Sequence, residues 1–210
     1  MKTTNLAVLF LGLLGVVAAV PASAETIYSN GPGNYGVGAW TINSGNSVTD
    51  SFTLSQDAVI NGATFDIWAP SGDTLTSVDW SIGTSQYGGT TTTVDPTGTF
   101  VETIADGYEI FDIYTESFSI SDLSLAAGNY WFTLQNATVP GGNDPIYWDE
   151  NDGPSVGYST QVGSIGAYEG TGLSGSETFT ITATPEPSSF LLLGSGLMGL
   201  AFLIRRKLAA

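Results

Sequence analysis

The residues able to do chemistry in the central part of this chain are carboxylates. Between Glu25 and Thr184 the sequence has no Lys, Arg, His or Cys, although it holds all but one of the 20 Asp and Glu residues. Nucleophilic catalysis by a triad or dyad needs an activating base, and the usual bases and thiols are missing here. Any reaction in this segment would therefore have to use carboxylates alone.

One run of acids invites comparison with the paired carboxylates of glycoside hydrolases. Glu109, Asp112 and Glu116 lie close together in a predicted strand. In a regular strand Glu109 and Asp112 point to opposite faces, whereas Asp112 and Glu116 share a face but lie about 13 Å apart. That distance exceeds the separation used by either hydrolase mechanism. The pattern favours solvated carboxylates on an outer face and predicts no enzyme activity, with a carboxylate-based glycan hydrolase as the alternative.

A second acidic cluster consists of Asp149, Asn151 and Asp152, just before Gly153. Hard oxygen ligands in a turn that contains glycine are what Ca²⁺ uses in proteins. The spacing is not that of an EF-hand, because the downstream Glu is missing, and Asn and Asp are also common in ordinary turns. Calcium is nevertheless the one cofactor that the sequence suggests.

Aromatic side chains near these acids would suit stacking on sugars. Trp131 alternates with the apolar residues on either side of it, and Tyr147, Trp148 and Tyr158 lie in or near predicted turns. Large aromatic residues are more often buried in a core than exposed for binding. Carbohydrate recognition is thus one interpretation, and ordinary core packing is the other.

The elements that must position these residues are predicted to be strands. Apolar residues alternate with polar ones in five rows: Val48, Phe52, Leu54; Ala63, Phe65, Ile67; Val78, Trp80, Ile82; Tyr130, Phe132, Leu134; and Phe179, Ile181, Ala183. Turns rich in Gly, Asn and Asp separate the rows, and no helical periodicity occurs between them. We therefore predict an all-β fold, an antiparallel two-sheet β-sandwich of the jelly-roll kind, with a closed barrel as the alternative.

The first 24 residues have the pattern of a signal peptide. Lys2 precedes an apolar run from Leu6 to Val20, and Ala22-Ser23-Ala24 is the pattern of small residues that signal peptidase accepts. Cleavage is expected between Ala24 and Glu25. Because the sequence has no cysteine, an acylated lipoprotein and disulfide bonds are both excluded.

The final 26 residues, 185–210, contain three different segments in a fixed order. Pro185, Glu186 and Pro187 break regular structure, an apolar run from Phe190 to Ile204 follows, and Arg205, Arg206 and Lys207 come after it. As a helix the apolar run would span about 22 Å, short for a hydrocarbon core of about 30 Å. The basic cluster predicts a transmembrane helix whose flank stays in the cytoplasm as a stop-transfer signal.

This order of segments resembles a PEP-CTERM sorting signal over Pro185 to about Lys207. The resemblance implies recognition by a membrane-embedded protease of the exosortase class, cleavage near Pro185-Glu186-Pro187, and delivery to the cell exterior. The alternative is an ordinary single-pass anchor, whose apolar length and flanking charge would be similar.

Together these patterns predict a signal peptide (1–24), a β-sandwich ectodomain (25–184) and a sorting signal (185–210). A domain without cations repels nucleic acid, which is therefore not an expected partner. We expect a non-enzymatic, structural or adhesive protein of the cell surface or extracellular matrix, associated with exopolysaccharide as in a biofilm. Signal peptidase, an exosortase-type protease and, transiently, the inner membrane are the expected partners, the ectodomain being periplasmic before delivery. A calcium-dependent glycan-binding module is a second alternative.

Overall fold

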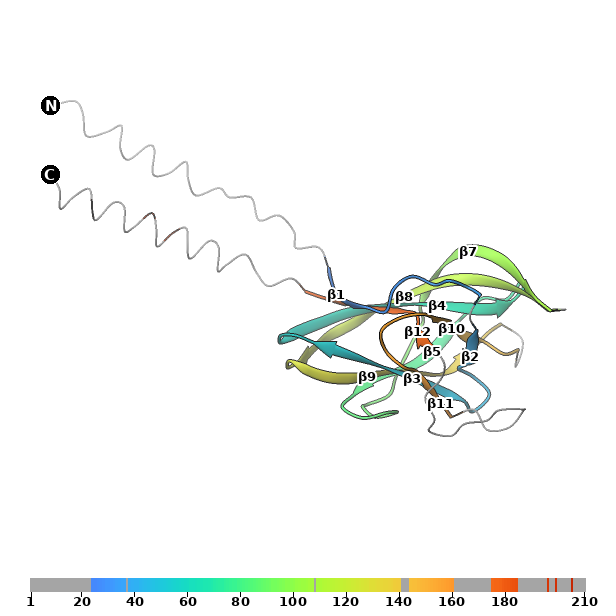
Figure 1. The fold of residues 1–210 in the computed structure, drawn as a ribbon, viewed down its shortest axis with the longest axis horizontal. Coiled ribbons are helices and arrows are strands. Elements are labelled where there is room, and N and C mark those ends of the chain that lie inside the picture. The colour runs from blue at the N-terminus through green and yellow to red at the C-terminus, as the bar shows by residue number, and fades with distance from the viewer. Residues whose placement is uncertain are drawn as a thin grey trace, which may run out of the picture. The chain divides into compact units, whose positions relative to one another are not determined.

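The alternation of apolar and polar residues along the chain is realised as β-strands (Figure 1). The computed structural model describes residues 24–184 except 37, 108, 141–143 and 161–174, and also residues 196, 199 and 205. In this part of the chain the strands are β1 (Glu25–Ser29), β2 (Ala39–Thr41), β3 (Ser47–Leu54), β4 (Ala58–Pro70), β5 (Ser77–Gly83), β6 (Thr92–Val94), β7 (Thr97–Asp106), β8 (Glu109–Leu125), β9 (Gly128–Thr138), β10 (Tyr147–Asn151), β11 (Tyr158–Ser159), β12 (Ser176–Glu177) and β13 (Phe179–Ala183). The predicted all-β class is confirmed.

These strands form two antiparallel sheets. The larger sheet has the order β1-β13-β4-β10-β12, with β8 also paired to β4, β7 paired to β8, and β2 paired to β10. The smaller sheet has the order β11-β3-β9-β5-β6. The prediction of two antiparallel sheets is therefore confirmed, and the described strands do not form one closed barrel.

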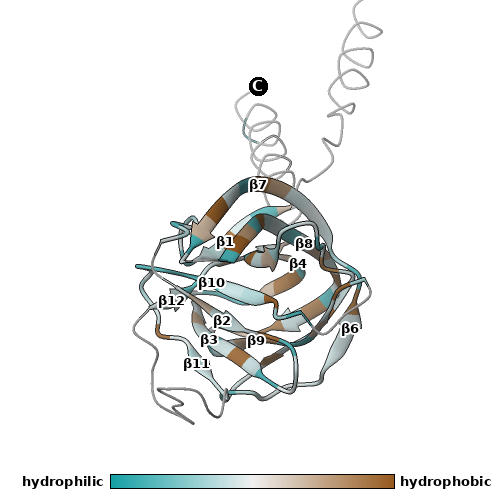
Figure 2. Ribbon diagram, turned by 90° about the vertical axis from the view of Figure 1, so that its right-hand side faces the viewer, coloured by the Kyte–Doolittle hydropathy of each residue, from teal (hydrophilic) through white to brown (hydrophobic). Residues whose placement is uncertain are grey.

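The predicted apolar rows face the space between the two sheets. Figure 2 shows apolar and polar positions alternating along the strands, and one core cluster takes residues from both sheets. At its centre the rings of Phe132, Trp148 and Phe179 contact one another, with centroids 5.4 to 5.9 Å apart. Burying a side chain of this size stabilises a fold by about 1.5–3 kcal/mol. These rings therefore account for a large share of what holds the two sheets together.

Residues 24–184 form one unit that contains this core. Its first and last strands are neighbours, because Glu25 of β1 pairs with Ala183 of β13. The predictions for residues 1–23 and for Pro185-Glu186-Pro187 lie outside the described residues, as does the apolar run apart from Gly196 and Gly199. Among the described residues no helix is long and apolar enough to cross a membrane.

Candidate functional site

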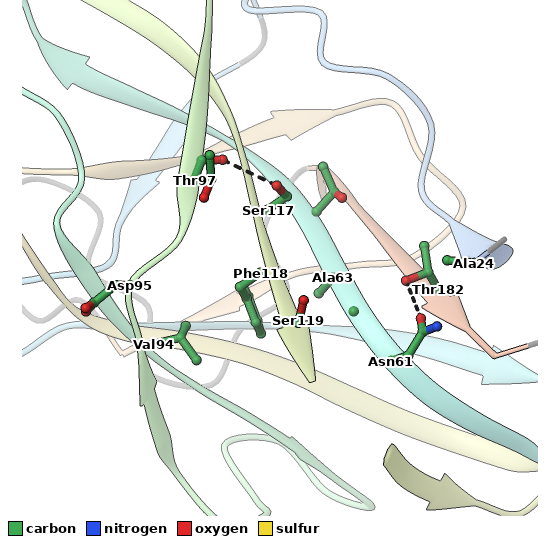
Figure 3. Close-up of a pocket in the computed structure, with 12 residues that line it drawn as sticks. Ala24, Asn61, Ala63, Val94, Asp95, Thr97, Ser117, Phe118, Ser119 and Thr182 are labelled. Carbon is green, nitrogen blue, oxygen red and sulfur yellow. Dashed lines mark hydrogen bonds between the residues drawn. The ribbon is translucent and has the colours of Figure 1, made fainter. Parts of the chain in front are cut away.

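A groove with a volume of about 660 Å³ opens on the larger sheet, where β13, β4, β8 and β7 lie next to one another (Figure 3). Most of the residues that line it are small and carry hydroxyl, amide or methyl groups. They are Ala24, Asn61, Gly62, Ala63, Thr64, Val94, Asp95, Thr97, Ser117, Phe118, Ser119 and Thr182. The groove thus presents neutral hydrogen-bonding groups and one carboxylate.

Strand register brings these polar residues together. Thr64 stands opposite Ser117, which in turn stands opposite Thr97, so three strands place a hydroxyl in one row. Ser117 Oγ donates a hydrogen bond to the carbonyl of Thr97 at 3.3 Å. Thr182 Oγ1 donates to Asn61 Oδ1 at 2.9 Å. The hydroxyls are therefore held in place while the remaining lone pairs and amide hydrogens stay available to a ligand.

Gly62 lines the floor of the groove and has no side chain to fill it. It pairs with Ser119 on one side and with Thr182 on the other. A Cβ atom at this position would lie 2.9 Å from Thr182 Oγ1 and 3.1 Å from the carbonyl oxygen of Phe118. Since both distances are tighter than ordinary contacts, glycine is what allows the strands and the Thr182 side chain to come this close.

A different set of polar residues lies between the sheets. Asp50, Glu150 and Glu177 are exposed by only 0%, 4% and 0%. Each occupies a core-facing position: Asp50 lies between Val48 and Phe52 on the same face of β3. Glu150 is two residues from Trp148, and Glu177 is two residues from Phe179. One acid from the smaller sheet and two from the larger sheet therefore point into the same interior.

Asp50 is well supplied with hydrogen bonds. Its Oδ2 accepts from Asn30 Nδ2 at 3.1 Å, from Ser176 Oγ at 3.0 Å and from the N–H of Glu177 at 2.7 Å. Its Oδ1 accepts from the N–H of Ser51 at 2.6 Å. Burial raises the pKa of Asp50, and these donors oppose that effect because they favour the ionised form.

Glu177 lacks this support, and Glu150 has less of it than Asp50. They stand directly opposite each other on β10 and β12. Both carboxylate oxygens of Glu177 and Oε1 of Glu150 are buried without a hydrogen bond of normal geometry among the described residues. Burial raises the pKa of Glu150, and hydrogen bonds from the Trp40 side chain and the Gly175 backbone oppose that effect. The pKa of Glu177 is raised well above its ordinary value, first by burial and then by the charges of Glu150, Asp50 and Asp149.

The predicted calcium ligands Asp149, Asn151 and Asp152 have different surroundings. Asp149 Oδ1 accepts a hydrogen bond from Trp68 Nε1 at 2.7 Å, and burial raises the pKa of Asp149 to about 7. Asn151 donates to the carbonyls of Asn30 and Pro32, and its Oδ1 accepts from the N–H of Gly153. Asp152 is exposed. Among the described residues, no group of three or more Asp, Glu, His or Cys side chains is arranged to hold a metal ion.

The expectation that the β8 acids are solvated is wrong for two of the three. Glu109 is exposed, but Asp112 and Glu116 are only 9% and 1% exposed. Glu116 stands opposite Phe65 and Gly98, and burial raises its pKa to about 7. Asp112 accepts hydrogen bonds from Thr103, Gly72 and Ser71, and these lower its pKa. The two acids therefore have separate environments with opposite effects on their pKa values.

The aromatic residues that sequence reasoning offered for sugar stacking divide between core and surface. Trp148 is the second residue of β10 and is fully buried, so it belongs to the core and not to a sugar-binding surface. Tyr147 is half-buried and contacts Phe111 edge to face. Trp131 and Tyr158 are also half-buried, and their ring centroids lie 5.5 Å apart. The Trp131–Tyr158 pair lies on the smaller sheet, between β9 and β11.

Sequence reasoning missed the interior acids, although the sequence carried a signal for them. Asp50 fills the gap in the apolar row Val48, Phe52, Leu54, and Glu177 extends the row that begins with Phe179. An acid at a core-facing position of an alternating row is unusual, because burying a charge is costly. The groove residues gave no comparable signal, since Ser and Thr are common on any exposed strand.

Comparison with known protein families gives a match at one end of the sequence. Residues 183–207 match the family described as PEP-CTERM protein-sorting motif. This confirms the resemblance based on Pro185-Glu186-Pro187, the apolar run and the basic cluster. A comparison of the chain with curated proteins finds no match. The chain carries a PEP-CTERM protein-sorting motif, which marks it as an exported protein that an exosortase-type system processes.

Proposed function

We propose that this protein is a non-enzymatic component of the cell surface or extracellular matrix whose β-sandwich contacts neutral exopolysaccharide. The observation that carries the proposal is the groove over β13, β4, β8 and β7, which is lined mostly by neutral hydroxyl, amide and methyl groups. Sugars are recognised largely through their own hydroxyl groups, which pair with such donors and acceptors. The role is structural or adhesive.

The charge of the domain selects the kind of polysaccharide. Residues 25–184 contain acids but no Lys, Arg or His. A polyanionic polysaccharide would be repelled by such a surface, whereas a neutral one is not. Contacts with one short glycan segment are expected to be weak, and binding of many domains along a repeating polymer would strengthen them by avidity.

The sorting motif supplies the route to that location. In our proposal the precursor lies in the inner membrane with its ectodomain in the periplasm, after signal peptidase cleaves between Ala24 and Glu25. The exosortase-type protease then cleaves near Pro185-Glu186-Pro187, and the domain reaches the surface. Mass spectrometry of the mature protein from its own cells tests this route. A mature protein that still ends at Ala210 would contradict it.

The alternative of a carboxylate-based glycan hydrolase draws less support from the molecule. Asp112 accepts hydrogen bonds from Thr103, Ser71 and Gly72, and Glu116 lies buried beside Gly98. Neither acid lines the groove described above. Release of reducing sugar from the cell's own exopolysaccharide would favour the hydrolase over our proposal.

The binding experiment uses two matched double variants of the purified protein. S117A/S119A removes two hydroxyls from the groove, while S121A/S124A removes two exposed hydroxyls from the same strand outside it. Affinity electrophoresis in gels that contain dextran, as a neutral probe, or alginate, as an anionic one, measures binding. We expect dextran or the cell's own neutral polysaccharide to retard the wild type and S121A/S124A but not S117A/S119A. Equal retardation of both variants would overturn the role of the groove.

A further inference from the structure

The interior of the sandwich holds two carboxylates that its own side chains do not neutralise. Glu150 and Glu177 occupy directly opposed positions on β10 and β12, so their side chains lie on one face of the sheet. They are 4% and 0% exposed. Between Glu25 and Thr184 the sequence offers no cationic side chain that could pair with either of them.

The unpartnered oxygen atoms point to a missing ligand. Buried polar atoms in native proteins almost always have hydrogen-bond partners. Asp50 follows this rule with four donors, but both oxygens of Glu177 and Oε1 of Glu150 do not among the described residues. Hydrogen bonds from Trp40 and Gly175 support Glu150 in part, but three oxygens of the two adjacent carboxylates stay without a partner of normal geometry. A positive ion that contacts both carboxylates would stabilise them.

We propose that Glu150 and Glu177 bind a divalent cation of the calcium type between the two sheets. Carboxylate oxygens are the preferred ligands of Ca²⁺, and each carboxylate can bind through both of its oxygens. The proposed site uses these two carboxylates; the described residues contain no group of three or more Asp, Glu, His or Cys side chains arranged to hold a metal ion. Backbone carbonyls and water complete calcium shells in proteins, and Ca²⁺ accepts irregular geometry more readily than Mg²⁺ does.

Glycines lie close to the carboxylate of Glu150 on two sides. A Cβ atom at Gly38 would lie 2.5 Å from Oε2 of Glu150, and one at Gly175 would lie 3.4 Å from Oε1. Glycine at these two positions therefore gives the carboxylate room on two sides. The site differs from the cluster predicted from Asp149, Asn151 and Asp152. Glu150 points between the two sheets, whereas the side chains of Asp149 and Asn151, its neighbours in β10, point to the opposite face of the strand. It is also independent of the polysaccharide groove.

Thermal unfolding of the purified protein with Ca²⁺ or with a chelator tests the proposal. We expect millimolar Ca²⁺ to raise the Tm of the wild type by about 5–10 °C, which corresponds to a ligand near 100 times its Kd. The E177Q variant removes one ligand and should lose this shift. Isothermal titration calorimetry should give one Ca²⁺ per wild-type chain and none for E177Q.

Two further variants make the result specific. E116Q makes the same change at another buried acid whose Oε2 lacks a partner, and D152N changes an exposed acid of the neighbouring turn. Both should keep the full Ca²⁺ shift. If E177Q fails to fold, E150Q takes its place with the same expectation.

Three outcomes would overturn the site. They are the absence of a Ca²⁺ shift in the wild type, an equal shift in E177Q, and a shift that D152N abolishes. An E177Q variant that is more stable than the wild type, with no response of either to Ca²⁺, would indicate that the two carboxylates share a proton. The polysaccharide gels would be unaffected by each of these results, so the two proposals can fail separately.

Discussion

The interior of the sandwich has an aromatic part and an acidic part, and the same strands build both. β3 contributes Phe52 and Asp50, β10 contributes Trp148 and Glu150, and the chain through β12 and β13 contributes Glu177 and Phe179. In each case the ring and the carboxylate belong to residues two positions apart in the sequence. The two regions are equally buried but differ completely in what stabilises them.

This comparison shows that burial alone does not say whether a position stabilises a fold. The rings gain free energy by leaving water and by contacting each other. The acids lose solvation, which Asp50 recovers through four hydrogen bonds, Glu150 only in part, and Glu177 not at all among the described residues. We therefore expect changes in the aromatic part to destabilise the fold and changes in the acidic part to have effects that depend on the partners of each acid.

The largest effect is expected from Phe132→Ala in the aromatic part. Phe132 is fully buried and its ring contacts Phe118, Trp148 and Phe179. Loss of the ring and the cavity left behind should lower the free energy of unfolding by about 3–5 kcal/mol. Urea denaturation followed by tryptophan fluorescence measures this. A loss below about 1 kcal/mol would mean that the aromatic part is not the main source of stability.

Among the acids, Asp50→Ala is expected to cause the largest loss of stability, because Asp50 is the acid with a full set of donors. Its removal leaves the N–H of Glu177 without this acceptor, and it leaves the Asn30 side-chain amide with one acceptor, the carbonyl of Glu177. We expect a loss of about 2 kcal/mol in the free energy of unfolding. The isosteric variant Asp50→Asn, which keeps one acceptor oxygen, is the control and should lose less. An Asp50→Ala variant that is more stable than the wild type would contradict this, because it would mean that the hydrogen bonds of Asp50 do not offset the cost of burying its charge.

Glu116→Gln tests a buried acid that lies apart from the acidic part. Because the pKa of Glu116 is raised from 4.5 to about 7, the folded state holds this proton more tightly than the unfolded state. The wild type should therefore lose stability as the pH rises from about 4.5 to 7, by about 3 kcal/mol from this group. The variant should lack this component, so the difference in Tm between the two proteins should grow over that pH range. Parallel pH profiles for both proteins would rule out a raised pKa.

The smallest effect is expected from Asp152→Asn. Asp152 is exposed and precedes Gly153 in the turn after β10. Surface changes of this kind usually alter the free energy of unfolding by less than about 0.5 kcal/mol. Urea denaturation of Asp152→Asn and of Asp50→Ala, measured in parallel, compares the effect of changing an exposed acid with that of changing an interior one. A loss comparable to that of Asp50→Ala would show that Asp152 has a structural partner.

The local pattern of residue types was sufficient to predict the strands and to recognise the sorting motif. The alternating rows, such as Val48, Phe52 and Leu54, face the core as predicted, because side-chain direction in a strand follows position in the chain alone. The motif at residues 183–207 is likewise contiguous, so its recognition does not depend on the fold. The pattern was less informative for Glu116, which it placed on a solvated face.

The sequence by itself determined that this is an all-β, exported chain whose domain lacks every cationic side chain. Only the tertiary structure decided that Glu150 and Glu177 oppose each other, that Asp50 reaches them from the other sheet, and that Thr64, Ser117 and Thr182 share one groove. The physical reason is that these neighbours lie far apart in sequence. Whether they come into contact depends on strand register and on how the two sheets pack, and neither can be predicted from any single stretch of residues.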